Sequence, residues 1–445
     1  MKSFYKSFFI LMIPMALKEL IAAFINLLDT VMLGNFGKDV IAAVGIANQW
    51  YFLFAVLTFG MCGGAGVFAS QYWGARDLNK VRKVLGINLV LVTLLSAVFI
   101  LVSAFAPEMV IKTFRKDPAV VEYGVKYLRL ACFSYFFSGV TAAYDMSLCC
   151  SENANIPFVS RFVGLIVNVV MNWVLIFGKL GFSALGIQGA AIATIIARMS
   201  ELAIILGVIY GKKLVQAAKI PELISIPKGM LGGYFKAALP VTLNEGAWAL
   251  GTVTYSWVFS QISTDAMVVI TIVQNIERLL LVFFHGGGNA AGILIGKLVG
   301  GSNYKEAYTV SKKLCLMNTV FALCVSVLFV FARPLVLLPY NISPEIYRDA
   351  LNILFLTAII MNVKALTFYF IVGVFRNGGD TKHAAIIDIT SMWLVGVPLV
   401  IVTGLFFKLP LEYIYIMMMG EEFIKLALSI PWFVSKKWIR NLVKK

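Results

Sequence analysis

The sequence repeats itself at an offset of 226 residues. Pro14 and Glu19 recur as Pro240 and Glu245, and both pairs are separated by this distance. The same offset relates other positions: the Phe-Ala pairs at 105–106 and 331–332, and Gly74 with Gly300. A chain of 445 residues is therefore close to two copies of one unit. Each copy carries a carboxylate in its first apolar segment, and we expect both carboxylates to be buried.

The composition places this duplicated unit in a lipid bilayer. Hydrophobic residues make up 60% of the chain and charged residues 13%, and the mean hydropathy is +0.88. A soluble chain carries about 25% charged residues, because its surface must face water. A repeat of this size in so apolar a chain indicates a pseudo-symmetric transporter bundle, with its binding site where the two halves meet.

Twelve segments are apolar enough for the roughly 20 residues that a membrane-crossing helix needs. They lie at 9–33, 42–70, 84–106, 121–148, 156–178, 186–210, 234–259, 266–296, 312–332, 347–374, 384–407 and 411–434. The predicted fold is all-α, with twelve transmembrane helices in two pseudo-symmetric six-helix lobes. We place the lobes at 1–210 and 233–435, joined by a cytoplasmic linker at 211–232 and followed by a basic tail at 436–445.

The net charge of +16 is distributed in a way that indicates orientation rather than nucleic-acid binding. Lys and Arg gather at both termini and in the even-numbered connections between apolar segments, and the stretch 112–116 is the exception. The positive-inside rule therefore predicts cytoplasmic termini. The basic, apolar start resembles a signal peptide, but its apolar segment runs on to Leu33 without a cleavage site, so we expect it to be retained.

Three charged residues in apolar segments have no partner on their own helix. A charge at the centre of a membrane helix costs about 2.5–3.5 kcal/mol and marks a functional candidate. Glu245 lies nine residues after Lys236, about 14 Å along the helix and near the midplane. Lys364 is also central, and Asp29 lies in the outer half. A buried carboxylate without a countercharge can exchange a proton, which suits ion-coupled transport.

Each of these charges also has a structural interpretation. Glu245 and Lys364 could pair with each other, either as a fixed lock or as a switch that protonation breaks. Asp29 could instead cap the turn at 34–37. Glu19 could be a relic of the repeat that stabilises Lys18 through a neighbouring helix.

Other charges lie at spacings that place them on one helix face. Arg198 with Glu201, and Glu421 or Glu422 with Lys425, are three or four residues apart, which favours self-neutralising structural pairs. The adjacent Glu277 and Arg278 cannot face each other, because neighbouring side chains of a helix point in different directions.

Uncharged polar and aromatic side chains complete the candidate sites. Asn168 and Asn172 share a helix face and could supply oxygen ligands, and packing is the alternative role for their amides. Trp248 and Tyr255 could bind flat organic cations through their ring faces, although aromatic residues often anchor helices at the lipid interface. Further candidates for a substrate cavity are Gln49, Asn244, Gln274 and Asp388. No Walker motif is present, so we expect an ion gradient to supply the energy.

Several motifs resemble those of the multidrug and toxic compound extrusion (MATE) transporter family. They occur in order along the whole chain: LDTVMLG at 28–34, QYWGARD at 71–77, GAAIAT at 189–194, PVTLNE at 240–245, and RNGGDT at 376–381 with Trp393 and Pro398. The resemblance implies two six-helix lobes around a central cavity in the bacterial inner membrane. It also implies alternating access and the antiport of drugs against Na⁺ or H⁺.

The resemblance assigns roles to particular residues. Asp29 looks like the cation-site aspartate of the first lobe, with Asn168 and Thr194 beside it, and Glu245 looks like the acid of the second lobe. Asn172 stands where one branch of the family has a second aspartate. Lys364 or Ala365 stands where another branch has an aspartate, which departs from that branch's sodium site.

The sequence therefore predicts a cation-coupled antiporter that exports amphipathic organic cations or drugs. We expect a monomer in the lipid bilayer with no nucleic-acid partner, no enzymatic activity, and no cofactor or bound metal apart from the transported H⁺ or Na⁺. One alternative is a lipid-linked oligosaccharide flippase of the same superfamily, which would need a larger basic cavity than Lys364 and Arg278 provide. Another is a membrane-embedded lipid enzyme, for which His383 with Asp380 or Asp388 is the candidate centre.

Overall fold

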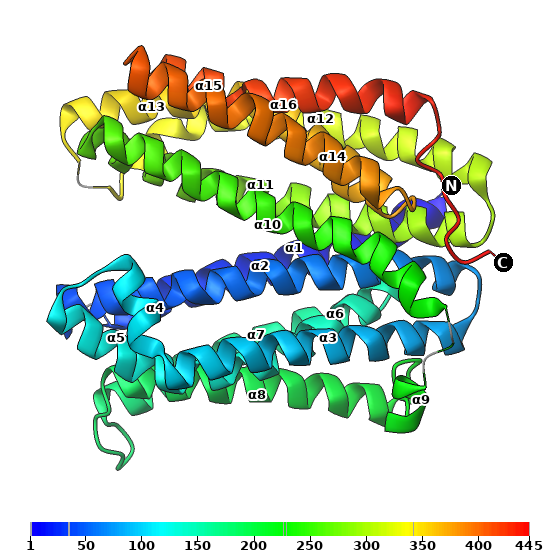
Figure 1. Cartoon of the computed structure of the whole chain (residues 1–445), viewed down its shortest axis with the longest axis horizontal. Coiled ribbons are helices and arrows are strands. Elements are labelled where there is room, and N and C mark those ends of the chain that lie inside the picture. The colour runs from blue at the N-terminus through cyan, green and yellow to red at the C-terminus, as the bar shows by residue number, and fades with distance from the viewer. Residues whose placement is uncertain (1, 34–35, 226, 228, 341, 445) are drawn as a thin grey trace. The chain divides into compact units, whose positions relative to one another are not determined.

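Helices form the computed structural model of this chain (Figure 1), which describes residues 2–33, 36–225, 227, 229–340 and 342–444. Within that part, the one feature of β type is an isolated bridge between Gly379 and Ile439. The predicted all-α fold is confirmed. Gly34 and Asn35 of the turn at 34–37, Lys228 of the expected linker and Lys445 of the expected basic tail lie outside the described ranges.

Contacts divide the chain into two compact units. The first unit comprises Leu17–Trp73 and Asp77–Phe235, and the second comprises Met1–Ala16, Gly74–Arg76 and Lys236–Lys445. The first helix is thus shared between them. The lobe, linker and tail boundaries expected from the sequence stay a prediction.

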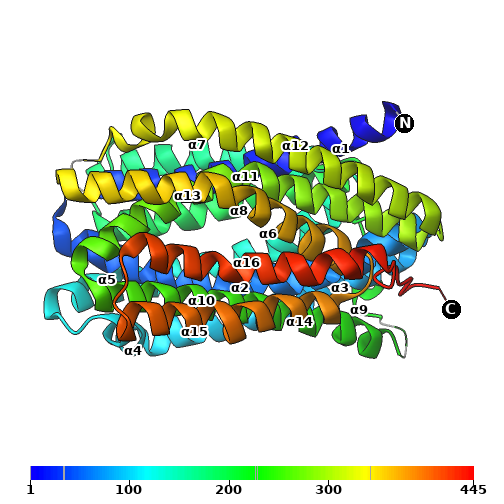
Figure 2. The ribbon, with the colours of Figure 1, turned by 90° about the horizontal axis from the view of Figure 1, so that it is seen from above.

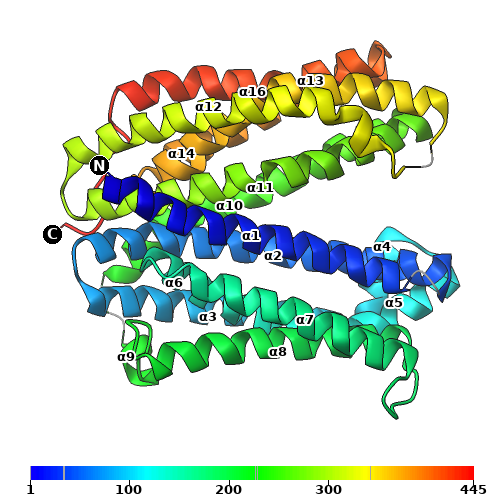
Figure 3. The same ribbon diagram turned by 180° about the vertical axis from the view of Figure 1, so that it is seen from behind.

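The first unit is built from helices that run alongside one another, and of α1 only the part from Leu17 onward belongs to it. Their bounds are α1 (Lys2–Leu33), α2 (Lys38–Gly74), α3 (Leu78–Phe105), α4 (Pro107–Phe114), α5 (Pro118–Ala131), α6 (Phe133–Cys150), α7 (Asn155–Phe177), α8 (Ile187–Gly211) and α9 (Ile220–Ile224). Helix α8 packs on α7, α6 and α5, and α3 packs on α6. Figure 3 shows α6, α7 and α8 side by side. The short helices α4 and α5 lie at one end of this unit and α9 lies at the other (Figure 1).

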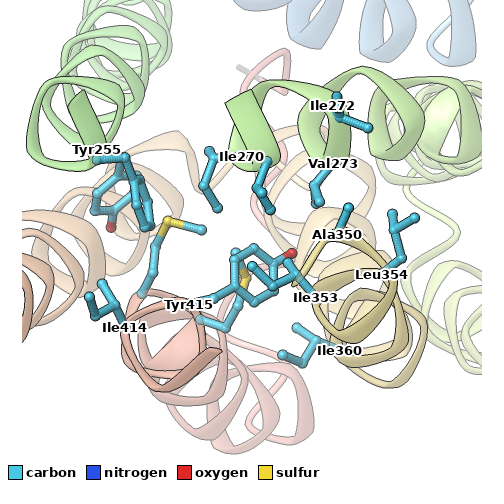
Figure 4. Packing of buried hydrophobic residues seen from close by; sticks show 14 of the residues in the cluster. Tyr255, Ile270, Ile272, Val273, Ala350, Ile353, Leu354, Ile360, Ile414 and Tyr415 are labelled. Atoms are coloured by element: carbon cyan, nitrogen blue, oxygen red, sulfur yellow. The ribbon is translucent and has the colours of Figure 1, made fainter. Parts of the chain in front are cut away.

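The second unit contains longer helices and three π-helical segments. Their bounds are α10 (Met230–Ile262), α11 (Thr264–Gly300), α12 (Tyr304–Leu337), α13 (Pro344–Phe368), η2 (Tyr369–Arg376), α14 (Thr381–Ser391), η3 (Met392–Gly396), α15 (Val397–Ile401), η4 (Val402–Phe406) and α16 (Leu411–Val434). Helix α16 packs against both α13 and α14, as Figure 2 shows. The apolar core between α10, α11, α13 and α16 includes Tyr255, Ile270, Ile353 and Tyr415 (Figure 4).

All twelve predicted apolar segments coincide with helices. In the described part of the chain, nine helices are long and apolar enough to cross a membrane. The segments 121–148, 234–259 and 411–434 are outside this group. The first is divided between α5 and α6, and the second is interrupted by polar side chains. The third carries four charged residues: Glu412, Glu421, Glu422 and Lys425.

The π-helical segments were not anticipated from the sequence. The segment η3 ends directly before Val397 and Pro398. Proline has no backbone N–H to donate to the carbonyl of Leu394, so the regular helical ladder cannot continue there. Such local widening often occurs at functional sites of long helices. The segment η2 extends α13 as far as Arg376, which brings a cation into the second unit's interior.

Candidate functional site

The Asp29 carboxylate lies beside two amide side chains in the first unit. The Nδ2 of Asn172 donates hydrogen bonds to Asp29 Oδ1 at 2.6 Å and to Asn168 Oδ1 at 3.2 Å. The two asparagines are one turn apart on α7, so their side chains lie on the same face of that helix. Both are buried. The structure therefore brings together three of the residues that the sequence nominated for cation coupling.

A small cavity opens beside Asp29. It offers about 30 Å³ to the centres of water-sized molecules, enough for a water molecule or a bare monovalent cation. Its lining comes from α1, α2, α5, α6 and α8: Ile25, Asp29, Ala47, Asn48, Tyr51, Tyr127, Ala131, Ser134, Tyr135, Thr194 and Arg198. Thr194 is thus placed at the cavity, where its hydroxyl donates to the Ala190 carbonyl at 3.0 Å. The cavity combines one carboxylate and one guanidinium group with several hydroxyl oxygens.

The nearby cation, Arg198, is engaged elsewhere. Its Nη1 bonds both carboxylate oxygens of Glu201, at 2.8 and 3.0 Å, and Arg161 also reaches Glu201 at 3.1 Å. The predicted Arg198–Glu201 pair is confirmed. Among the described side chains, no Lys or Arg lies within ion-pair distance of Asp29. The Asp29 carboxylate is therefore hydrogen-bonded but has no direct countercharge.

Glu19, the first of the two repeated glutamates, is exposed, whereas the sequence predicted that it would be buried. Its neighbour Lys18 pairs instead with Asp145 of α6, at 3.4 Å. Successive residues of a helix point in different directions, so only one of these two side chains can face α6. Asp145 was missed by the sequence arguments, although it was visible as a carboxylate within the segment 121–148.

The predicted pairing of Glu245 with Lys364 is wrong. Glu245 Oε1 lies 2.6 Å from Nη2 of Arg376, and both side chains are largely buried. Lys364 pairs with Glu277 of α11. Glu245 thus has a basic neighbour that comes from the motif at 376–381. The buried Glu277 and the exposed Arg278 do point apart, as predicted.

The remaining candidates fall into two groups. Asn244 donates to Asp388 at 2.9 Å, and Tyr255 donates to Glu421 at 2.6 Å, so both are part of a polar network in the second unit. The other three have no such contact: Trp248 is 42% exposed, Gln49 is exposed and Gln274 is half-buried. A role for these three in a substrate cavity stays a prediction.

Comparisons with known proteins identify the family. The MatE family model matches residues 14–174 and 240–402, and its two matches begin 226 residues apart, at Pro14 and Pro240. The chain is 26% identical over 442 residues to the uncharacterized transporter YisQ of Bacillus subtilis, covering 98% of this chain and 95% of that protein. It is 23% identical over 443 residues to the probable multidrug resistance protein NorM of Thermotoga maritima, covering 97% and 93%.

Solved structures show the same fold. A crystal structure of a MATE protein in complex with MaL6 superimposes with a TM-score of 0.88 at 19% identity, covering 99% of this chain and 97% of that one. A MOP superfamily transporter from Pyrococcus furiosus gives a TM-score of 0.87 at 19% identity, with the same coverage. Two matches of one family model across most of the chain exclude the interpretation as a lipid enzyme. The chain belongs to the MatE family and is a multi-pass membrane transporter rather than an enzyme.

Proposed function

We propose that this protein exports amphipathic organic cations or drugs across the bacterial inner membrane in exchange for H⁺ or Na⁺. The observation that carries the proposal is the Asp29 carboxylate, which lies at a cavity without a direct countercharge. The names of several relatives, which are multidrug resistance proteins, support the substrate class. The basic termini and even-numbered connections support a cytoplasmic location for both ends.

The Asn172 amide can adapt its hydrogen bond to whether Asp29 is ionised or has bound H⁺ or Na⁺. In the structure its amide nitrogen donates to the carboxylate, and its own Oδ1 has no hydrogen-bond partner. An amide can also present its oxygen, which accepts from a protonated carboxyl group or binds a cation. Occupation of the cavity by H⁺ or Na⁺ would therefore rearrange the contact between α1 and α7.

Coupling requires that the ion and the substrate prefer different states of the transporter. A ligand shifts the balance between inward-open and outward-open states only through its differential affinity for them. We propose that the coupling ion at Asp29 favours one state and that the organic cation favours the other. Exchange then follows from alternating access, with the ion gradient as the source of energy.

The test is gradient-driven dye export by the full-length protein in vesicles. The wild type should accumulate ethidium against its gradient when a proton or sodium gradient is imposed, and the Asp29→Asn variant should lose this export. Asp265→Asn serves as the matched control, because Asp265 is exposed in the first turn of α11. Full export by Asp29→Asn would refute the assignment. Flipping of a lipid-linked oligosaccharide without dye export would favour the flippase alternative.

A further inference from the structure

Three carboxylates in the second unit share one ammonium group. Nζ of Lys425 lies 2.7 Å from Asp388, 3.2 Å from Glu422 and 4.0 Å from Glu421. None of these four side chains is more than 15% exposed. The sequence predicted a self-neutralising pair on α16, and both of its possible contacts are present. Asp388 from α14 adds a third acid, so Lys425 neutralises only part of the cluster.

The neighbouring charges do not supply the missing cations. Helix α16 packs against α13, α14, α15 and the three π-helical segments. From α10, Tyr255 donates a hydrogen bond to Glu421 of this helix. Lys364 of α13 is paired with Glu277, and Arg376 of η2 is paired with Glu245. The segments η3, α15 and η4 contain no charged residue. On α14, Lys382 is exposed and His383 pairs with Asp380 at 2.8 Å. Among the described residues, the cluster around Lys425 is therefore left with two carboxylates in excess.

Two uncompensated negative charges are too unfavourable to persist in a buried site. An isolated ionised carboxylate moved out of water is far more costly than its neutral acid form, so such groups neutralise unless a cation joins them. The hydroxyl groups of Tyr255 and Thr367 donate to Glu421 and Glu422, and these bonds leave the net charge unchanged. Two monovalent cations, protons included, are needed for neutrality.

Asn244 provides an independent indication that a proton is the ligand. Its side chain is 2% exposed, and its Nδ2 donates to Asp388 Oδ2 at 2.9 Å. Its Oδ1 has no hydrogen-bond partner. An unsatisfied buried carbonyl is uncommon in proteins and calls for a donor. Rotation of the amide would let this oxygen accept a hydrogen bond from a protonated Asp388, so that Asn244 can serve either charge state of the carboxyl group.

We infer that Asp388, Glu421 and Glu422 form a proton-binding site around Lys425, with Asn244 as a positioning residue. The neutral cluster holds two protons, shared among three carboxyl groups. In this neutral state one ionised carboxylate forms an ion pair with Lys425, and the other two groups carry the protons. Loss of one proton gives the cluster a net charge of −1, with the ammonium shared between two ionised carboxylates. Sodium fits less well, because a second cation would lie close to the Lys425 ammonium. The role of this site in transport rests on the proposed function, whereas proton binding itself does not.

Infrared difference spectroscopy of the purified full-length protein tests the inference directly. Spectra recorded between acidic and alkaline pH would show the band of carboxylic acid groups that are shielded from water. The wild type should show this band, and Glu421→Gln and Glu422→Gln should each lose one carboxyl contribution. Asn244→Leu, which offers neither a donor nor an acceptor, should shift the band without removing a carboxyl group.

Matched controls separate this cluster from other acids. Glu412 lies on the same helix but outside the cluster, and Asn352 donates a hydrogen bond to it. The Glu412→Gln variant should leave the shielded band unchanged. Asp388→Asn changes the cluster from a different helix, so it provides a second variant if a glutamine variant does not fold. Size-exclusion chromatography in detergent checks that each variant remains folded.

The outcomes distinguish this inference from the proposed function. If the glutamine and Asp388→Asn variants leave the shielded band unchanged, the cluster does not bind protons, whatever the dye-export assay shows. If added Na⁺ abolishes the band at constant pH, the site binds sodium and the proton assignment is wrong. If the band behaves as expected but no variant of Asp29 affects export, the proton site stands and the proposed function fails.

Discussion

The carboxylates inside the helices of this transporter have partners of different kinds, and the partner decides what each carboxylate can do. Asp29 accepts a hydrogen bond from an amide and faces a cavity, which is the arrangement on which the proposed ion exchange rests. Glu245 is paired with the Arg376 guanidinium at 2.6 Å. Glu277 is held by an ammonium group. At the residue scale, Asp29 is therefore the carboxylate that the proposed function uses for ion exchange, and Glu245 and Glu277 are each engaged in an ion pair.

The pair of Glu245 and Arg376 gives a stability prediction. Arg376→Gln would leave Glu245 buried without its countercharge, and removal of one partner from a buried ion pair costs about 3–5 kcal/mol. The double variant Glu245→Gln, Arg376→Gln should regain most of this loss, because no charge is left unpaired. Thermal unfolding of the purified variants in detergent measures both effects. Equal stability of the single variant and the wild type would contradict the pairing.

At the scale of elements, two helices pack most closely where a glycine leaves room between their backbones. Helices α7 and α8 form a tight pair in the first unit. A Cβ added to Gly189 of α8 would lie 2.6 Å from the backbone oxygen of Leu175 on α7. No neighbouring atom lies within 4 Å of a Cβ added to Gly207 of the same helix. The two glycines therefore have different roles, although both lie in an apolar helix.

This difference predicts opposite effects of one substitution. Gly189→Ala should destabilise the protein by about 1–3 kcal/mol, because overpacking forces the two backbones apart. Gly207→Ala should be neutral or stabilise the helix by up to about 1 kcal/mol, since alanine has the higher helix propensity. Unfolding midpoints of the two variants, measured side by side, provide the comparison. A Gly189→Ala variant as stable as Gly207→Ala would show that α7 and α8 do not approach so closely.

At the scale of the whole molecule, the duplicated sequence and the charge distribution predict how the chain is oriented in the membrane. The family model matches twice at the 226-residue offset that separates Pro14 from Pro240. Six predicted membrane crossings in each copy would return the chain to its starting side. The basic residues of the even-numbered connections then predict that this side is the cytoplasm.

The orientation can be measured with reporter fusions. A green fluorescent protein joined after Lys445 should fluoresce, and alkaline phosphatase joined at the same place should remain inactive, because phosphatase folds only after export. A phosphatase fusion in the odd-numbered connection near 260–265 should be active. An active phosphatase at the C-terminus would overturn the predicted topology.

The sequence alone was sufficient for the fold class, the helices and the family, because these depend on features that are local along the chain. Apolar segments long enough to cross a bilayer must be helical, since their backbone polar groups have no other partners there. The motifs at 28–34, 189–194 and 240–245 were likewise readable without coordinates. The grouping of Asp29 with Asn168, Asn172 and Thr194 was predicted only through the resemblance to a family.

Only the tertiary structure decided which charges meet. Spacing along one helix identified the Arg198–Glu201 pair, because side chains three residues apart share a face. It could not reveal that Arg376 reaches Glu245, that Lys18 reaches Asp145, or that Asp388 joins Lys425. These contacts connect different helices, and their geometry follows from helix rotation and packing. The physical reason is that the partners of a buried charge are chosen by the surrounding helices rather than by its own.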